Sequence, residues 1–470
     1  MFKQFGLFSL LVFILPLGVS AQSFTDFKRT QVGSFEKFQD QKDQEFNKYL
    51  KEQWKEYEAY TTPKFFEKPK PKNIESTQET PSKDIGPRID ISPITIPEIP
   101  QKKEQEQVKK DITLNFFGTP IGFNVDTKIK NVRFYPKNQN GIIIFFGVMA
   151  SSDYEHIVYD IKKTADQMVL NDWGVYQLVA MLSKSIYTQP DEEQLFRWFI
   201  LSKLGYDVKI GLVKNHIVLL HNSKQTIFAT PRYKIDGQYY YAVAYQSSTS
   251  SLGRLYTYEK KYPEANKKLD FSLETAPNFA QELVLKKLKF SSVDGNYEVD
   301  FNINKNLIDF MKTYPQVDYD VYFNAAFDSY VYDQLANFLR VQLNGKKASN
   351  GINFILHFVQ KSFLYERDDD QFGKDKVMFA EETLFYDHSD CEDRAILFAK
   401  LIKKLFNYGV VGVKYKDHMS TALYVPIKGD NVKLGSRKYV IADPTYINAN
   451  VGINMPKYKN IQPESFFKLK

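Results

Sequence analysis

The chain has 470 residues, 43% of them hydrophobic, which is enough to build the cores of two or three domains. Its formal net charge of +7 is mild for this length, and its lysine runs alternate with acids, so no nucleic-acid partner is predicted. The histidines and the single cysteine have no metal-ligand spacing, and no phosphate-binding loop is present. No metal or other cofactor is therefore predicted.

Residues 1–21 have the pattern of a secretory signal peptide. Lys3 precedes an apolar run, and small residues lead to an expected cleavage before Gln22. The run is too short to span a membrane, and no later segment is long and apolar enough, so no membrane span is predicted. No cysteine stands at the cleavage point to carry a lipid. We expect an exported protein, periplasmic or secreted, that is not a lipoprotein.

Residues 22–110 differ in composition from the rest of the chain. Aromatic residues in 22–60 recur mostly three, four or eight positions apart, which is typical of one or two amphipathic helices. We expect these helices to pack on the globular part of the chain, with docking on a protein partner as the alternative. Residues 61–110 are rich in Pro, Lys and Glu, which predicts an extended and largely unstructured linker.

The predicted fold class is α+β, with several domains. Residues 111–248 read as an α+β domain with strands in 112–125 and 141–148, then helices near 154–170, 172–187 and 191–204, then strands over 206–245. A β-rich segment, 249–319, follows. Residues 320–470 are predicted to form helices and then strands at 409–415, 418–425 and 437–442.

Residues 191–220 resemble residues 390–426. Both begin with an acidic helix start, continue as an apolar helix, and give a strand, a turn and a His before the next strand. This alignment places Glu192 at the position of Cys391 and His216 at the position of His418, with no Asp at the third position. We interpret 111–248 as a degenerate copy of the C-terminal domain, with chance similarity of helix–hairpin units as the alternative.

The single cysteine, Cys391, cannot form an internal disulfide in an exported chain. Ser389 and Glu392 have the spacing of a capping box, which places Cys391 in the first turn of a helix. Backbone N–H groups and the helix dipole favour a thiolate there. Acids at Asp390, Glu392 and Asp393 oppose that effect, so the sequence predicts that a base assists the thiol.

His418 and Asp443 are the predicted partners of the thiol. His418 opens one predicted strand, and Asp443 ends the next one, just before Pro444. An imidazole can pair with the thiolate and later protonate the leaving amine. A carboxylate on the neighbouring strand can hold the other ring nitrogen.

These residues resemble the transglutaminase-like superfamily over roughly residues 320–460. The matching positions are Asp390-Cys391-Glu392-Asp393, His418, Asp443-Pro444-Thr445, and upstream Phe358-Val359-Gln360, Tyr365 and Glu382-Thr383-Leu384. The resemblance implies a papain-like domain in which Cys391 at a helix start packs on an antiparallel sheet. It also implies a Cys391–His418–Asp443 triad, a thioester intermediate, and an oxyanion hole for which Gln360 and Tyr386 are the candidate donors.

The predicted function is that of a cysteine peptidase or amidase, acting by hydrolysis or acyl transfer on a peptide, protein or cell-wall amide. Hydrolysis is favoured over protein cross-linking by a transglutaminase, because nothing in the sequence indicates a shield that excludes water. A second interpretation is a non-catalytic binding or scaffold protein that keeps the fold. A third gives Cys391 a redox or intermolecular disulfide role. Asp368-Asp369-Asp370 lacks the spacing of a calcium loop and is predicted to form a solvated turn.

Overall fold

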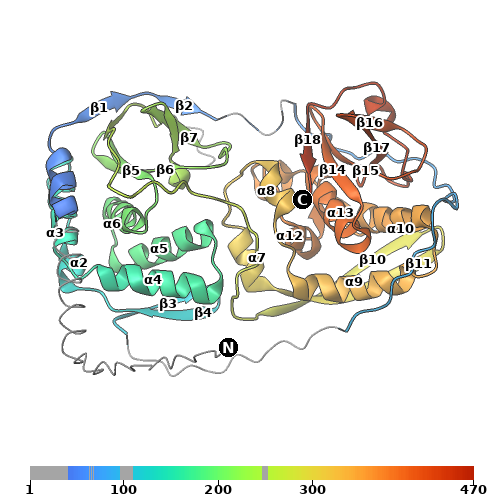
Figure 1. Cartoon of the computed structure of the whole chain (residues 1–470), viewed down its shortest axis with the longest axis horizontal. Helices are drawn as coiled ribbons and strands as arrows, with labels where there is room; N and C mark the ends of the chain where they lie inside the picture. The colour runs from blue at the N-terminus through green and yellow to red at the C-terminus, as the bar shows by residue number, and fades with distance from the viewer. Residues whose placement is uncertain (1–40, 63, 65, 67, 96–109, 246–251) are drawn as a thin grey trace, which may run out of the picture.

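The computed structural model describes residues 41–62, 64, 66, 68–95, 110–245 and 252–470. The predicted signal peptide and residues 22–40 lie outside the described residues. Helices and antiparallel sheets mix throughout the described chain, which confirms the α+β fold class. Figure 1 shows an N-terminal half and a C-terminal half side by side. One continuous cluster of buried apolar side chains runs through both halves.

The helices of the N-terminal half confirm three of the sequence predictions and correct a fourth. The predicted helices are α4 (Glu155–Met168), α5 (Asp172–Ile186) and α6 (Pro190–Lys203). The strand predicted at 141–148 is wrong, because α3 (Gln139–Ala150) covers it. Asn138 caps this helix by accepting hydrogen bonds from the amides of Asn140 and Gly141. An apolar run buried on most sides does not distinguish strand from helix by periodicity.

The N-terminal half contains one seven-stranded sheet. Its strand order is β1-β9-β5-β6-β8-β7-β2, and all its neighbouring strands are antiparallel. The strands are β1 (Trp54–Tyr57), β2 (Ala59–Thr61), β5 (Val208–Val213), β6 (His216–Asn222), β7 (Pro231–Ile235), β8 (Gln238–Tyr241) and β9 (Leu255–Tyr258). The sheet therefore extends past residue 248, where its domain was predicted to end.

The N-terminal segment enters this sheet, which corrects the helix predicted through residue 60. Residues 41–49 are helical, but β1 and β2 then pair with the outer strands β9 and β7. Trp54 lies opposite Tyr258 in that pairing, and their rings are 5.5 Å apart. Residues 54–61 pair with the two open edges of the sheet. This pairing makes them strands although their aromatic residues have helical spacing.

Two hairpins and short helices complete the first half and join it to the second. The β-rich segment predicted after residue 249 is confirmed by a long antiparallel hairpin. These elements are β3 (Ile112–Phe116), β4 (Thr119–Phe123), α2 (Thr127–Asn131), β10 (Leu283–Ser292), β11 (Gly295–Asn304) and α7 (Lys305–Met311).

The C-terminal half places helices on one face of a five-stranded antiparallel sheet with the order β16-β17-β15-β14-β18. Its helices are α8 (Tyr319–Asn324), α9 (Ser329–Leu343), α10 (Ala348–Lys361), α11 (Asp368–Phe372), α12 (Ala380–Phe385) and α13 (Cys391–Phe406). Its strands are β14 (Gly409–Lys414), β15 (Met419–Tyr424), β16 (Asn431–Leu434), β17 (Arg437–Ala442) and β18 (Ser465–Lys468), with the short parallel pair β12 (Leu364–Tyr365) and β13 (His388–Ser389). Three of these strands match the predicted ones within a residue, and β16 and β18 were not predicted.

The two sheets share one connectivity. Five consecutive strands of the N-terminal half lie in the order β9-β5-β6-β8-β7, and five consecutive strands of the C-terminal half lie in the order β18-β14-β15-β17-β16. Each set follows a long helix, α6 in one half and α13 in the other, and every neighbouring pair is antiparallel. The regions aligned by sequence therefore occupy corresponding positions in their sheets.

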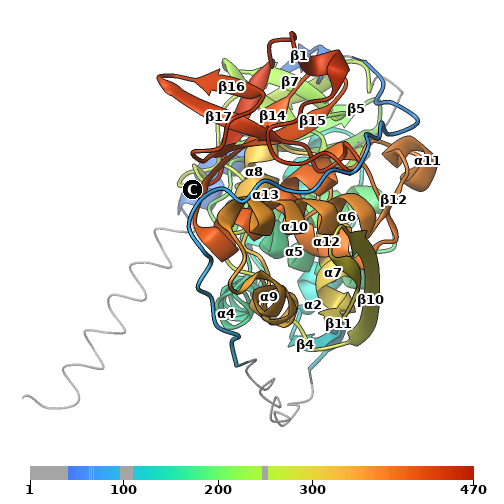
Figure 2. The same ribbon diagram turned by 90° about the vertical axis from the view of Figure 1, so that its right-hand side faces the viewer.

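Residues 68–95 cross the C-terminal half in an extended conformation. In Figure 2 this blue segment runs between the red sheet and α10. Its backbone is hydrogen-bonded to the half it crosses, by Thr77 to Ile447 at 3.0 Å and by Ile89 to Lys346 at 2.8 Å. The segment is extended, as predicted, but it is fixed along its length instead of being an unstructured linker.

Among the described helices, none is by itself long and apolar enough to span a membrane. Helices α3 and α4 reach the required length and composition only as a pair, and they are bent by 77° where they meet. The apolar side chains of α3 lie mostly in the core.

Candidate active site

Cys391 is the first residue of helix α13, where the sequence placed it. The cap differs by one position from the prediction: Asp390 is the N-cap, and Asp393 accepts a hydrogen bond from the Asp390 amide at 3.2 Å. Ser389 instead accepts from the Arg394 guanidinium at 3.0 Å. Ser389–Glu392 and Asp390–Asp393 both have the spacing of a capping box. The Asp390–Asp393 box is formed, and Ser389 pairs with Arg394.

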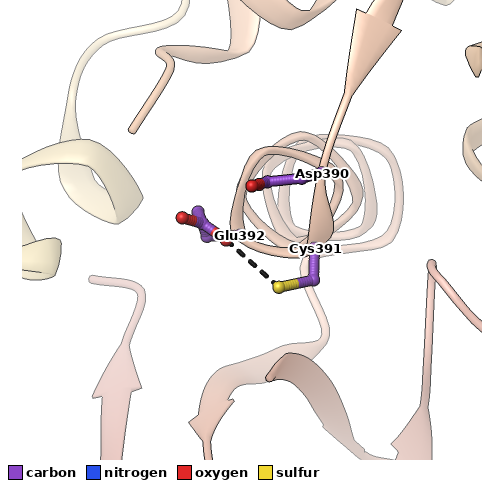
Figure 3. A group of neighbouring side chains, drawn as sticks. All are labelled: Asp390, Cys391 and Glu392. Atoms are coloured by element: carbon purple, nitrogen blue, oxygen red, sulfur yellow. Dashed lines mark hydrogen bonds between the residues drawn. The ribbon is translucent and has the colours of Figure 1, made fainter. Parts of the chain in front are cut away.

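The Cys391 thiol is enclosed, with 0% of the residue exposed. It donates to the Glu392 carboxylate, with Sγ and Oε2 3.1 Å apart (Figure 3). Sγ also accepts from the backbone amide of Met419 at 3.4 Å. Among the described residues these are the partners of Sγ, so the thiol touches the residue that follows His418 and is not hydrogen-bonded to the His418 ring.

His418 and Asp443 are brought together as the sequence predicted. His418 lies immediately before β15, Asp443 immediately after β17, and these strands are neighbours. Nε2 of His418 and Oδ2 of Asp443 are 2.8 Å apart. The other carboxylate oxygen accepts from the amides of Thr445 and Tyr446. The carboxylate is thus held by backbone donors, and Nδ1 remains as the ring nitrogen that can exchange a proton.

Two tyrosines fix the plane of the His418 ring. The Tyr458 ring is stacked on it with centroids 5.0 Å apart, and Tyr458 is stacked in turn on Tyr415 at 4.6 Å. His418 itself is only 2% exposed. The imidazole therefore has one orientation, set by Asp443 on its edge and by Tyr458 on its face.

The two predicted oxyanion donors, Gln360 and Tyr386, contact other residues. Gln360 on α10 donates from its amide nitrogen to the carbonyls of Asp443 and Ala449, at 3.0 and 3.1 Å. With both N–H groups engaged, Gln360 holds the loop after β17 and has no hydrogen left for an oxyanion. Tyr386 packs against Phe372, with ring centroids 5.3 Å apart, and no contact joins it to Cys391 in the described part of the chain.

Tyr365 is a donor that the sequence argument did not single out. It ends β12, which pairs with β13 just before Cys391. Burial raises the pKa of Tyr365, so its hydroxyl stays protonated. That hydroxyl donates to the carbonyl of Pro71 at 2.8 Å. A protonated phenol that already binds a backbone carbonyl is suited to bind the carbonyl of a substrate.

A buried lysine from the N-terminal segment faces the acids that flank the thiol. Nζ of Lys70 contacts the carboxylates of Asp368 at 2.7 Å and Glu392 at 2.6 Å, and it also contacts Asp390. All four side chains are buried. Asp368 is therefore not in the solvated turn predicted for it. No sequence pattern indicates this contact, because Lys70 is one of many lysines in a polar segment.

These acids are close enough together to hold a cation. Oxygen atoms of Asp368, Asp390 and Asp393 lie within 4.8 Å of one another, as do ligand atoms of Asp390, Cys391 and Glu392. The Lys70 ammonium contacts three of these carboxylates, those of Asp368, Asp390 and Glu392. The cluster thus already has a positive partner supplied by the chain itself.

The charges of the site keep the thiol neutral in this arrangement. Burial, followed by the negative charges of Glu392 and Asp390, raises the pKa of Cys391 well above its ordinary value, and Lys70 opposes this. Burial alone would lower the pKa of Lys70, but the carboxylates of Asp390, Glu392 and Asp368 raise it well above its usual range. The lysine stays charged, and the thiol stays protonated as long as it is covered.

Arg394 supports the site from below the first turn of α13. Its guanidinium donates to the carbonyls of Gln360 at 3.2 Å and Phe363 at 2.9 Å, in addition to Ser389. Burial lowers the pKa of Arg394 to about 10. This side chain ties α10 and the start of β12 to the helix that carries the thiol.

The corresponding position in the N-terminal half is occupied by Asp191 instead of Glu192. Oδ1 of Asp191 accepts from the amide of Ile217, which follows His216, at 2.8 Å. This repeats the contact of Cys391 with the amide that follows His418. Glu192 accepts instead from the Phe134 amide at 3.2 Å. The sequence alignment is therefore one residue out of register at the helix start.

No protein-family model, curated protein or solved structure matches this chain. Any functional conclusion consequently rests on the geometry of the site. That geometry can support nucleophilic attack by a sulfur atom once the thiol loses its proton, with a histidine already oriented by a carboxylate.

Proposed function

We propose that this chain is an exported cysteine-dependent hydrolase or acyl transferase that acts on amide or peptide bonds through Cys391, His418 and Asp443. The proposal includes the transglutaminase-like, papain-like character of residues 320–470. The observation that carries it is the 2.8 Å contact between His418 and Asp443 beside a helix-start thiol that touches the next residue, Met419.

In the proposed reaction, His418 takes the proton of the Cys391 thiol through Nδ1, and the thiolate attacks the carbonyl carbon. The tetrahedral oxyanion is stabilised by the Cys391 backbone N–H and by the Tyr365 hydroxyl. His418 then protonates the leaving amine, and a thioester remains on Cys391. Water or an amine, deprotonated by His418, releases the acyl group. Asp443 stabilises the imidazolium in both halves of the reaction.

An activated ester tests this proposal without knowledge of the substrate. The full chain is mixed with p-nitrophenyl acetate, and acylation is followed by the nitrophenol burst and by the mass of the peptide that contains Cys391. We expect one acyl group on Cys391, no burst with Cys391→Ala, and a burst slowed about 10²-fold or more with Asp443→Asn. Acylation elsewhere, or an Asp443→Asn variant as fast as the wild type, would contradict the proposal.

The acceptor is identified in the same experiment. Hydroxylamine added during turnover competes with water for the thioester and forms a hydroxamate. Hydroxamate in proportion to the amine concentration indicates acyl transfer, as in a cross-linking transglutaminase. Release of acetate that is unaffected by the amine indicates a hydrolase.

The second candidate function is a binding or scaffold protein that keeps this fold without turnover. The observation that favours it is the enclosure of Cys391, whose thiol donates to Glu392 and whose pKa is raised by burial and by Glu392. Under this alternative no ester acylates Cys391 even after the site has been opened by mutation.

A further inference from the structure

The segment that crosses the site, residues 68–80, is anchored on both sides of the catalytic pair. The Lys68 amide donates to the carbonyl of Lys416 at 3.3 Å, two residues before His418. The amide of Thr77 donates to the carbonyl of Ile447 at 3.0 Å, and the Ile447 amide donates to Glu75 at 3.1 Å. The second anchor is a parallel β-bridge that lies four residues after Asp443. We call residues 68–80 the strap.

Between these anchors the strap fills the approach to the site. A cavity of about 30 Å³ lies between them, lined by strap residues and by site residues, among them Pro71, Asn73, Ile74, Glu75, Tyr365 and His418. A space of this size holds about one or two water molecules. Cys391, which is 0% exposed, does not line this space.

The strap makes the contacts that a bound peptide would make. Its Pro71 carbonyl accepts from Tyr365, and its backbone adds to the chain at Ile447 in the manner of an added strand. Two asparagines of the same loop, Asn448 and Asn450, donate to the carbonyls of Thr77 and Thr80 at 3.0 and 2.8 Å. These contacts are made with backbone atoms, so another sequence in the extended conformation can make them as well.

The Lys70 side chain fills a pocket that the C-terminal half builds without the strap. Its carboxylates come from Asp368, Asp390 and Glu392, and one oxygen each of Asp368 and Asp390 has no hydrogen-bond partner among the described residues. Buried carboxylates without a counter-charge are costly. When Lys70 leaves, the pocket therefore favours another cation of the same size and reach.

We propose that the strap occupies the substrate groove of this site, and that the substrate is an extended polypeptide whose lysine side chain replaces Lys70 in the pocket of Asp368, Asp390 and Glu392. This inference rests on the proposed function. It adds the class of substrate and the event that opens the site. The strap is displaced as a unit, because its backbone anchors and its lysine hold the same short stretch of chain.

Alkylation of Cys391 by iodoacetamide, followed by mass spectrometry of the native full chain, measures how often the strap is open. Thr77→Pro removes the amide that binds Ile447 and should speed alkylation about tenfold, as expected for the loss of one backbone hydrogen bond. Lys70→Met, which keeps the length of the side chain and removes its charge, should speed it at least as much. The matched controls are Thr77→Ala, which keeps the amide, and Lys72→Met, which removes an exposed lysine of the strap. Both should label at the wild-type rate.

A peptide copy of residues 68–80 tests the lysine pocket. Added to the Thr77→Pro variant, it should slow alkylation toward the wild-type rate, whereas the same peptide with Met in place of its Lys70 should protect at least about tenfold more weakly. The inference is overturned if Thr77→Pro labels no faster than Thr77→Ala, or if the two peptides protect equally. Circular dichroism verifies that each variant is folded. If Lys70→Met does not fold, the labelling rate of Thr77→Pro decides the test.

The two proposals fail separately. Alkylation needs no turnover, so strap variants that label quickly but are never acylated by an ester contradict the proposed function alone. An ester that acylates Cys391 in a His418- and Asp443-dependent manner, together with strap variants that label at the wild-type rate, contradicts the strap proposal alone.

Discussion

The two halves of this molecule put different side chains on the same arrangement of strands. In the C-terminal half the amide of Met419, the first residue of β15, donates to the thiol of Cys391, and in the N-terminal half the amide of Ile217, the second residue of β6, donates to the carboxylate of Asp191. The histidines that precede these amides also differ, because the His418 residue is 2% exposed, whereas the His216 side chain is 71% exposed. The shared backbone contact holds the helix start against the sheet in both halves.

The difference shows which features of the C-terminal site are structural and which are available for chemistry. A helix start hydrogen-bonded to a strand start is present in both halves, so it belongs to the fold. Among the described residues, His418 is hydrogen-bonded to a carboxylate at a strand end, 2.8 Å from Asp443, whereas the mostly exposed His216 lies 3.5 Å from the helix-start carboxylate of Asp191. The N-terminal segment also contacts the two halves differently. Residues 54–61 add strands to the N-terminal sheet, and residues 68–80 cross the C-terminal half.

The largest expected effect separates the two histidines. We expect His418→Ala to slow the acylation of Cys391 by about 10²-fold to 10⁴-fold, because the thiol loses the base that removes its proton. His216→Ala, the matched change in the other half, should leave the rate unaltered, since the His216 side chain is 71% exposed and its ion-pair partner among the described residues is Asp191, at 3.5 Å. Stopped-flow measurement of the nitrophenol burst gives both rates. Equal rates for the two variants would remove the functional distinction between the halves.

The second effect is a pH dependence of stability that has opposite signs for two buried groups, one in each half. Burial, together with the charge of Arg197, lowers the pKa of His221 on β6 to about 3. The unfolded chain, with an ordinary histidine pKa near 6.5, binds the proton more readily, so stability is lost as the pH falls below about 6.5. At pH 5 this amounts to about 2 kcal/mol. In the C-terminal half, burial raises the pKa of Glu381 to about 7, so protonation of this carboxyl on the same acidification favours the folded state.

His221→Phe tests the first sign, because it keeps an aromatic ring and removes the titration. Urea unfolding at pH 7 and pH 5 should show that the wild type loses about 2 kcal/mol more than the variant over this interval. His216→Phe is the control, since its side chain is mostly exposed. Parallel losses in the wild type and in His221→Phe would mean that His221 takes up its proton without unfolding.

The residues whose positions in the fold the sequence predicts correctly are those whose signal is local. The helices α4, α5 and α6 have apolar residues at helical spacing, and Cys391 follows acids and a serine that end a loop. His418 and Asp443 lie at strand ends, where a change of periodicity and Pro444 mark the boundary. Neighbouring strands then bring these ends together, as the order of elements predicts.

The features that the sequence did not identify depend on partners far along the chain. Lys70 contacts Asp390 across 320 positions, and no local pattern distinguishes it from the exposed lysines beside it. Gln360 looks like an available donor in the sequence, but its amide is occupied by the carbonyls of the loop after β17. The apolar run at 141–148 allows a strand or a buried helix, and the cap at Asn138 decides for the helix.

The smallest expected effect compares the two helix starts directly. Asp191→Ala removes the acceptor of the buried Ile217 amide and should destabilise the protein by about 1–3 kcal/mol, the cost of leaving a buried donor unpaired. Cys391→Ala removes a sulfur acceptor at 3.4 Å, a weaker contact, and should cost about 1 kcal/mol or less. Asp191→Asn, which keeps an oxygen acceptor, is the control for the carboxylate charge. Urea titration at pH 7 measures all three. A larger loss from Cys391→Ala than from Asp191→Ala would mean that the thiol itself stabilises the fold. The expected order means instead that the helix-start side chain contributes more to stability in the N-terminal half than in the C-terminal half, where little of the fold depends on the sulfur of Cys391.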